Sequence, residues 1–179
     1  MTETLLVLTV FTIKDSHIIY KGGEFMDNRD FYTFTEYMKR EDNHLTASME
    51  DYLEMIYRLS IETGFTRIHE LSNALNVQPP SATKMVQRLN DLNLLNYEKY
   101  GVIMLKEDGK KLGEALLNRH IIIEKFLRLL GVEDDVLLEE TEKIEHTISN
   151  KTLECFNNYI NFINDNPDIG EKFTKYISK

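Results

Sequence analysis

Six side chains of types that bind transition metals occur at helical spacing in three separate segments of the chain. They are four carboxylates and two imidazoles: Asp51, Glu54, His120, Glu142, Glu145 and His146. The first pair is three residues apart, and the last three stand at i, i+3 and i+4, so each group shares one helix face. This set of oxygen and nitrogen donors, without sulfur, suits Mn²⁺, Fe²⁺, Zn²⁺ or Co²⁺. Solvated surface charge is the alternative interpretation, because spacing along the chain cannot show that the three segments meet.

A second group of side chains could contact nucleic acid. Residues 81–92 are predicted to form a helix after the break at Pro79 and Pro80. The exposed face of that helix would present Ser81, Thr83, Lys84, Gln87 and Arg88, which can hydrogen-bond to bases or phosphates. A solvated helix face would carry similar residues, so the pattern alone leaves DNA binding open.

The elements around these residues follow a recognisable order. Helices are predicted over 46–62 and 68–75, before the helix over 81–92, and a hairpin of two strands is predicted over 94–100 and 102–106. This is the order of a winged helix-turn-helix, in which the helix after the turn enters the major groove. Further helices are predicted over 110–130, from 133 onwards and over 153–164, so the fold class is mainly α.

Composition limits the function further. The 179 residues carry a formal charge of −9, but the stretch from 81 to 111 has six basic and four acidic residues. A basic face on an acidic body is compatible with DNA binding. The single Cys155 excludes an internal disulfide, which favours a cytoplasmic location, and we expect it to be a small buried apolar residue. No apolar run is long enough to span a membrane, so no membrane partner is expected.

Residues 1–43 differ from the rest and are treated as an N-terminal extension. The segment Lys21-Gly22-Gly23-Glu24-Phe25-Met26 can be back-translated into a purine-rich ribosome-binding sequence before a start codon. Residues 1–25 are therefore either an untranslated leader read as protein or a short hairpin, and the intact mass of the native protein distinguishes the two.

Seven segments between about 45 and 163 carry a family resemblance: Ser48–Tyr57, Pro80–Leu89, Tyr97–Tyr100, Arg119-His120, Phe126-Leu127, Gly131-Val132 and Ile144–His146. In these segments the chain resembles the metal-dependent diphtheria toxin repressor family, and its manganese transport regulator branch in particular. The resemblance implies an N-terminal winged helix-turn-helix domain (44–108), followed by an all-helical metal-binding and dimerisation domain (109–179).

The resemblance also implies a function and a set of sites. It implies that the four carboxylates and two histidines described at the start are the ligands of a site for two Mn²⁺ per subunit, with one carboxylate bridging the two ions. The metal would act as co-repressor. The implied DNA contacts are Pro80, Ser81, Thr83, Lys84, Gln87 and Arg88 in the recognition helix and Lys99 in the wing. The partners would be a second copy of the chain and a palindromic operator that controls metal-uptake genes. The iron-responsive branch has sulfur ligands where this chain has Asp51 and Glu142, so hard carboxylates there favour Mn²⁺, with Fe²⁺, Zn²⁺, Co²⁺ and Cd²⁺ as further candidates.

There are three alternatives to this function, and the sequence disfavours the first. A di-iron enzyme would use paired Glu-x-x-His motifs, and none occurs near His120, so no catalysis and no small organic substrate are expected. An iron- or zinc-responsive regulator would share the fold. A winged-helix regulator that senses an organic ligand would leave the acids as surface charge.

Overall fold

A computed structural model of the protein describes residues 45–98 and 101–178, which fall within one compact unit. Residues 1–44, 99–100 and 179 lie outside the described residues. The described residues therefore include neither residues 1–25, predicted to be a leader or a hairpin, nor the predicted DNA contact Lys99.

Three helices form the first part of the described chain: α2 (Ala47–Ser60), α3 (Ile68–Ala74) and α4 (Pro79–Asp91). Asn76, between α3 and α4, has a φ of 51°, a left-handed conformation that Asn tolerates and that reverses the chain tightly. Pro79 and Pro80 form the first turn of α4, where the missing N–H groups cost nothing. The predicted helices are confirmed, and α4 begins two residues earlier than expected because of this proline turn.

A small antiparallel sheet completes this part, with strand order β1-β3-β2. Its strands are β1 (Thr66–Arg67), β2 (Leu95–Tyr97) and β3 (Val102–Leu105), and Leu95 pairs with Leu105. The predicted hairpin of β2 and β3 is confirmed. β1 was not predicted, because two residues are too few to show an alternating pattern.

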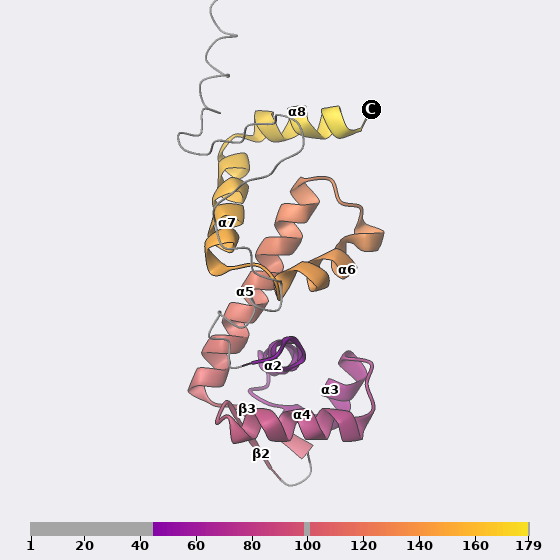
Figure 1. Cartoon of the computed structure of the whole chain (residues 1–179), viewed down its shortest axis with the longest axis vertical. Coiled ribbons are helices and arrows are strands. Elements are labelled where there is room, and N and C mark those ends of the chain that lie inside the picture. The colour runs from indigo at the N-terminus through magenta and orange to yellow at the C-terminus, as the bar shows by residue number, and fades with distance from the viewer. Residues whose placement is uncertain (1–44, 99–100, 179) are drawn as a thin grey trace, which may run out of the picture. The chain divides into compact units, whose positions relative to one another are not determined.

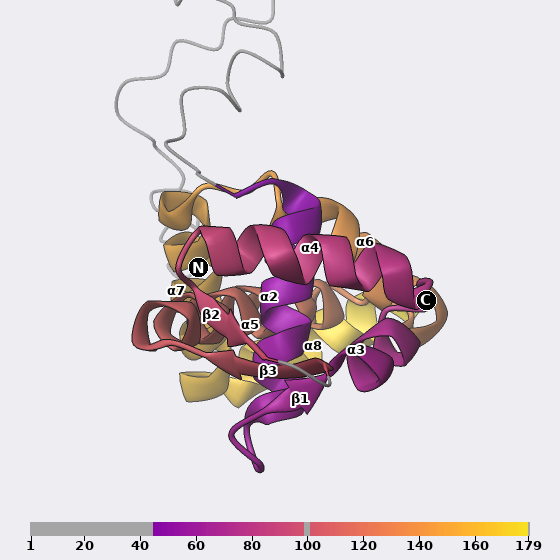
Figure 2. The same cartoon turned by 90° about the horizontal axis from the view of Figure 1, so that it is seen from below.

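One apolar core joins these helices to the sheet. Leu53, Ile56, Leu71, Val86, Leu89, Leu95 and Ile103 are completely buried in it. Figure 2 shows α4 crossing α2, with β2 and β3 alongside. Because α2 and α4 pack into the same core, a shift of α2 also affects the position of α4.

The long helix α5 (Glu107–Leu129) connects this core to the helices that follow (Figure 1). It begins three residues before the predicted start. A Cβ on Gly109 would lie 1.9 Å from the carbonyl oxygen of Leu94, and one on Gly113 would lie 2.7 Å from Cβ of Tyr57 in α2. Both glycines therefore allow α5 to pack closely against the hairpin and α2.

The remaining helices are α6 (Asp134–Glu145), α7 (Asn150–Asp165) and α8 (Pro167–Ile177), of which α6 and α7 pack on α5. α8 was not predicted. The expectation that Cys155 is buried is wrong: its side chain is exposed. On α7, Phe156 stacks on Phe126 of α5, with ring centroids 3.9 Å apart, and Ile160 is buried, so Cys155 lies beside the packed face and not on it. Among the described helices, none has the length and apolarity needed to cross a membrane.

Candidate metal centre

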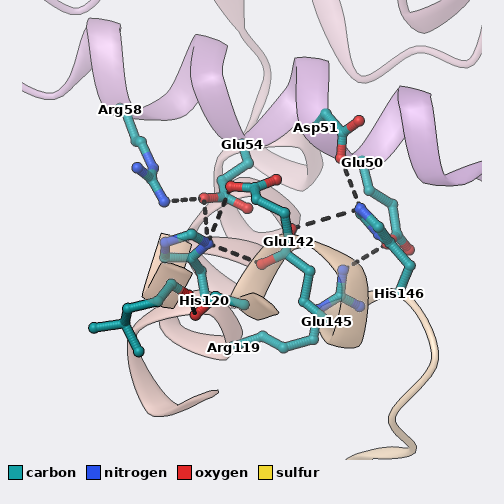
Figure 3. Close-up of polar contacts among 11 residues, drawn as sticks. Glu50, Asp51, Glu54, Arg58, Arg119, His120, Glu142, Glu145 and His146 are labelled. Atoms are coloured by element: carbon teal, nitrogen blue, oxygen red, sulfur yellow. Dashed lines mark hydrogen bonds and ion pairs between the residues drawn. The ribbon is translucent and has the colours of Figure 1, made fainter. Parts of the chain in front are cut away.

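Three helices bring the six predicted ligands together. Helix α2 carries Asp51 and Glu54, α5 carries His120, and α6 with its C-terminal cap carries Glu142, Glu145 and His146. Because α5 packs against both α2 and α6, the polar faces of all three helices meet, as Figure 3 shows. Glu54, His120 and Glu145 are buried, so these three are not solvated surface charges.

One group of ligand atoms comes from Glu54, His120 and Glu145, and these atoms all lie within 4.8 Å of one another. Nδ1 of His120 is 2.9 Å from Oε2 of Glu145 and 4.0 Å from Oε1 of Glu54. Two carboxylates and an imidazole at this spacing can hold one divalent cation.

A second group comes from Asp51, Glu145 and His146, with its ligand atoms also within 4.8 Å of one another. Nε2 of His146 is 2.8 Å from Oδ1 of Asp51 and 3.5 Å from Oε1 of Glu145. Glu145 belongs to both groups and turns one oxygen toward each histidine. Its side chain is 1% exposed. A carboxylate in this position can bridge two cations.

Glu142 lies at the edge of the site. Its Oε1 is 3.7 Å from Nδ1 of His120, and half of its side chain is exposed. It belongs to neither three-residue group, although it can reach a cation bound beside His120.

The pKa values show how strongly the carboxylates crowd one another. Burial and the charge of Glu145 raise the pKa of Glu142. Burial also raises the pKa of Glu54, although the neighbouring Arg58 opposes the rise. The hydrogen bond to Glu145 raises the pKa of His120, and contacts with Asp51 and Glu50 raise that of His146 to about 10. The site therefore concentrates negative charge that protons partly neutralise and that divalent cations could neutralise instead.

The donor set fits a hard divalent cation. Oδ1 of Asp51 is buried and has no well-directed hydrogen-bond donor among the described residues, even though His146 is near. The charge of His146 compensates this carboxylate, and a metal ion would coordinate the oxygen directly. The arrangement of oxygen and nitrogen ligands is therefore compatible with Mn²⁺ or a similar ion.

Three further residues belong to this site and were not predicted to. Glu50 is buried and accepts hydrogen bonds from Arg119 (2.5 Å) and His146 (2.9 Å). Burial raises the pKa of Glu50, but these two hydrogen bonds outweigh it and the net shift is downward. Arg58 forms an ion pair with Glu54. The four-residue spacing of Glu50, Glu54 and Arg58 places them on one helix face, but acids and bases at that spacing are common on solvated helices.

The predicted DNA-contacting residues lie on α4. Pro80, Ser81, Lys84, Gln87 and Arg88 are exposed. Thr83 is half-buried and its hydroxyl donates to the carbonyl of Pro79 (2.9 Å). The buried residues of the same helix, which include Ala82 and Val86, face the core. Helix α4 thus presents an exposed polar surface as well as its buried apolar one.

A helix-turn-helix core with a hairpin, joined through a histidine–carboxylate cluster to a helical region, defines the class of metal-dependent DNA-binding regulators. Comparison with known proteins agrees. Residues 44–103 match the family model "Iron dependent repressor, N-terminal DNA binding domain", and residues 106–174 match "Iron dependent repressor, metal binding and dimerisation domain". The chain belongs to the iron-dependent repressor family.

Its relatives include regulators named for manganese. The chain is 39% identical over 134 residues to the HTH-type transcriptional regulator MntR of Oceanobacillus iheyensis, covering 75% of this chain and 91% of that one. It is 40% identical over 134 residues to MntR of Bacillus subtilis, covering 75% and 94%. These matches confirm the predicted family and its manganese branch. They also confirm the prediction that the protein is a DNA-binding regulator and not an enzyme.

Solved structures support the fold. The manganese regulator SloR superposes with a TM-score of 0.58 at 30% identity, over 66% of this chain and 55% of that one. ScaR with bound Zn²⁺ gives a TM-score of 0.53 at 31% identity, over 64% and 54%. The matched part spans little more than half the length of these two solved chains. The predicted fold, mainly helical with an N-terminal DNA-binding domain and a helical dimerisation domain, is confirmed.

Proposed function

We propose that this protein is a manganese-responsive transcriptional repressor of metal-uptake genes, acting in the cytoplasm with Mn²⁺ as co-repressor. The observation that carries the proposal is the sharing of Glu145 between two histidine–carboxylate groups that join α2 to α5 and α6. The MntR relatives, at about 40% identity over most of their length, support the same function.

The six ligands divide between two metal positions in this proposal. Glu54 and His120 would hold a cation at one position and Asp51 and His146 would hold one at the other, with Glu145 available to both. Glu142 adds a carboxylate beside His120 from its half-exposed place at the edge. Two Mn²⁺ per subunit follow from this division, and the absence of sulfur ligands favours Mn²⁺ over softer ions by ligand type.

The link from metal to DNA follows from the position of α2. Bound cations supply positive charge that offsets the repulsion among the carboxylates. Asp51 and Glu54 are then held against His120 on α5 and Glu145 on α6, so α2 is fixed against both helices. Since α2 shares its core with α4, the recognition helix is fixed as well. The population shifts toward the geometry in which two α4 helices of a homodimer reach successive major grooves.

The DNA contacts remain those predicted: Pro80, Ser81, Thr83, Lys84, Gln87, Arg88 and, beyond the described residues, Lys99. A homodimer requires a palindromic operator, because each half-site faces one α4. We retain the division into a DNA-binding domain (44–108) and a metal-binding and dimerisation domain (109–179) as part of the proposal.

The test is DNA binding to the palindromic promoter region of a manganese-uptake gene from the same genome, at fixed salt. Wild type, Asp51→Ala and the control Glu62→Ala are compared with chelator, Mn²⁺, Fe²⁺ or Zn²⁺. Glu62 is exposed and lies just beyond α2. We expect tight binding only with Mn²⁺, lost in Asp51→Ala and kept in Glu62→Ala. Binding that is indifferent to metal would refute the co-repressor role, and binding promoted only by Fe²⁺ or Zn²⁺ would replace manganese with that ion.

A further inference from the structure

Glu50 lies immediately behind the metal centre and joins all three helices that build it. It is on α2, Arg119 is on α5 and His146 caps α6, so its two hydrogen bonds span 69 and 96 residues of sequence. The side chains of the three residues are 8%, 13% and 17% exposed. A buried carboxylate with two such partners has its position closely defined.

The geometry sets the orientation of the His146 ring. A carboxylate can only accept hydrogen bonds, so Nδ1 of His146 must carry the hydrogen that is directed at Oε2 of Glu50. This leaves Nε2 on the opposite side of the ring, 2.8 Å from Oδ1 of Asp51 and 3.5 Å from Oε1 of Glu145. The nitrogen that can bind a cation therefore points into the second ligand group (Figure 3).

Arg119 binds the same carboxylate. Its Nη2 donates to the same oxygen, Oε2, that accepts from His146. Glu50 is not among the residues whose ligand atoms converge on either metal position in the described part of the chain. The guanidinium and the imidazole N–H thus converge on one oxygen of the carboxylate.

We propose that Glu50 is a positioning residue, held by Arg119, that fixes the His146 ring with Nε2 directed at the metal position shared with Asp51 and Glu145. Its role is specific to that position, because His120 contacts Glu145, Glu142 and Glu54 but not Glu50. Hydrogen-bond partners of this kind commonly raise metal affinity 10- to 100-fold. The inference rests on the proposed function, since it assumes that the centre binds metal.

The experiment is a calorimetric titration of the full chain with Mn²⁺, on wild type, Glu50→Ala, Glu50→Gln and the control Glu62→Ala. We expect two binding events in wild type and in the control. In Glu50→Ala, one event should weaken by roughly 10- to 100-fold while the other stays nearly unchanged. Glu50→Gln should be intermediate, because its amide oxygen still accepts the hydrogen bond from Nδ1 but carries no charge.

A spectroscopic measurement separates positioning from a general loss of structure. In histidine-¹⁵N-labelled protein loaded with diamagnetic Cd²⁺, wild type should show a slowly exchanging Nδ1–H on His146. That signal should exchange faster in Glu50→Gln and vanish in Glu50→Ala, while the His120 signals stay unchanged.

The outcomes are distinguishable. If wild type does not bind Mn²⁺, the proposed function fails before Glu50 is tested. If wild type binds two Mn²⁺ and Glu50→Gln leaves both events and the Nδ1–H signal unchanged, the positioning role is wrong and the proposed function stands. Equal weakening of both events would assign Glu50 to the packing of the helices and also overturn the inference.

Discussion

Replacement of the bridging carboxylate should abolish both metal sites together, whereas replacement of a ligand used once should abolish only one. The Glu145→Gln substitution keeps the shape of a side chain that is 1% exposed and removes the charge that faces both histidines. Asp51→Asn removes a charge from one group only. The two variants differ in a way that distinguishes a bridged pair of ions from two independent sites.

The size of the effect follows from linkage. With free Mn²⁺ at about 100 times the dissociation constant, each occupied site adds about 2.7 kcal/mol to the free energy of unfolding. Wild type should gain about 5 kcal/mol, Asp51→Asn about half of that, and Glu145→Gln close to none. For a chain of this length, Tm rises by roughly 2–4 °C for each kcal/mol of added stability. The gain of about 5 kcal/mol in wild type should therefore raise Tm by about 10–20 °C.

The assay is thermal unfolding with chelator and with Mn²⁺, accompanied by the metal stoichiometry. In chelator, Glu145→Gln should unfold near the wild-type temperature, because the loss of its contact with His120 is offset by reduced repulsion from Glu54 and Glu142. If Glu145→Gln kept half of the wild-type stabilisation by Mn²⁺, Glu145 would not be a bridge and the reasoning from the two groups would be refuted.

Four further predictions concern His146, Arg58, Gly113 and Arg88. The pKa of His146, about 10 without metal, lies above its ordinary 6.5. The ion pairs of His146 therefore stabilise the metal-free fold fully below pH 6.5, and this stabilisation is lost as pH rises through 10. Near neutral pH, Mn²⁺ must displace a proton from His146 in order to bind it. Affinity for Mn²⁺ should rise up to about tenfold per pH unit near neutrality, with proton uptake by the buffer seen in calorimetry. Arg58→Met should tighten Mn²⁺ binding by roughly fivefold, about 1 kcal/mol, because a cation beside Glu54 is removed; unchanged binding would show that the ion pair is fully screened. Gly113→Ala should lower the free energy of unfolding by about 1–3 kcal/mol in urea titrations, since its Cβ would lie 2.7 Å from Tyr57, and an unchanged value would mean that α5 shifts without cost. Arg88→Ala should weaken DNA binding and reduce the slope of log affinity against log salt by about 1 if it contacts a phosphate, whereas a changed base preference would assign it to base recognition.

The local structure followed directly from short-range sequence patterns. The proline pair at 79–80 and the helical spacing of Ala82, Val86 and Leu89 were sufficient to predict α4. Helical spacing alone placed Asp51 with Glu54, and Glu142 with Glu145 and His146, on shared faces. These features depend on residues within one or two turns of each other, so a pattern of period 3.6 is sufficient to find them.

Other elements were missed where the local signal was short or ambiguous. β1 is two residues long and exists because Thr66 pairs with Ile103 of β3. Cys155 was expected inside because cysteines are often buried, but the register of α7 against α5 selects Phe156 and Ile160 for the packed face. Which residue of a helix faces inward depends on its rotation against its neighbours, and the sequence of one helix does not fix that rotation.

Predicting the metal centre required sequence patterns, and describing its geometry required the tertiary structure. Residue types and spacing specified the donors, and the family resemblance specified their grouping. Only the packing of α2 and α6 on α5 brought His120 within 2.9 Å of Glu145, 25 residues away, and His146 within 2.9 Å of Glu50, 96 residues away. The sharing of Glu145 and the placement of Glu50 behind His146 are consequences of that packing. The reason is physical: the sequence determines which face of each helix is polar, but the distance between two faces depends on the residues between the helices. One of these is Gly113, whose lack of a side chain lets α5 approach Tyr57 of α2.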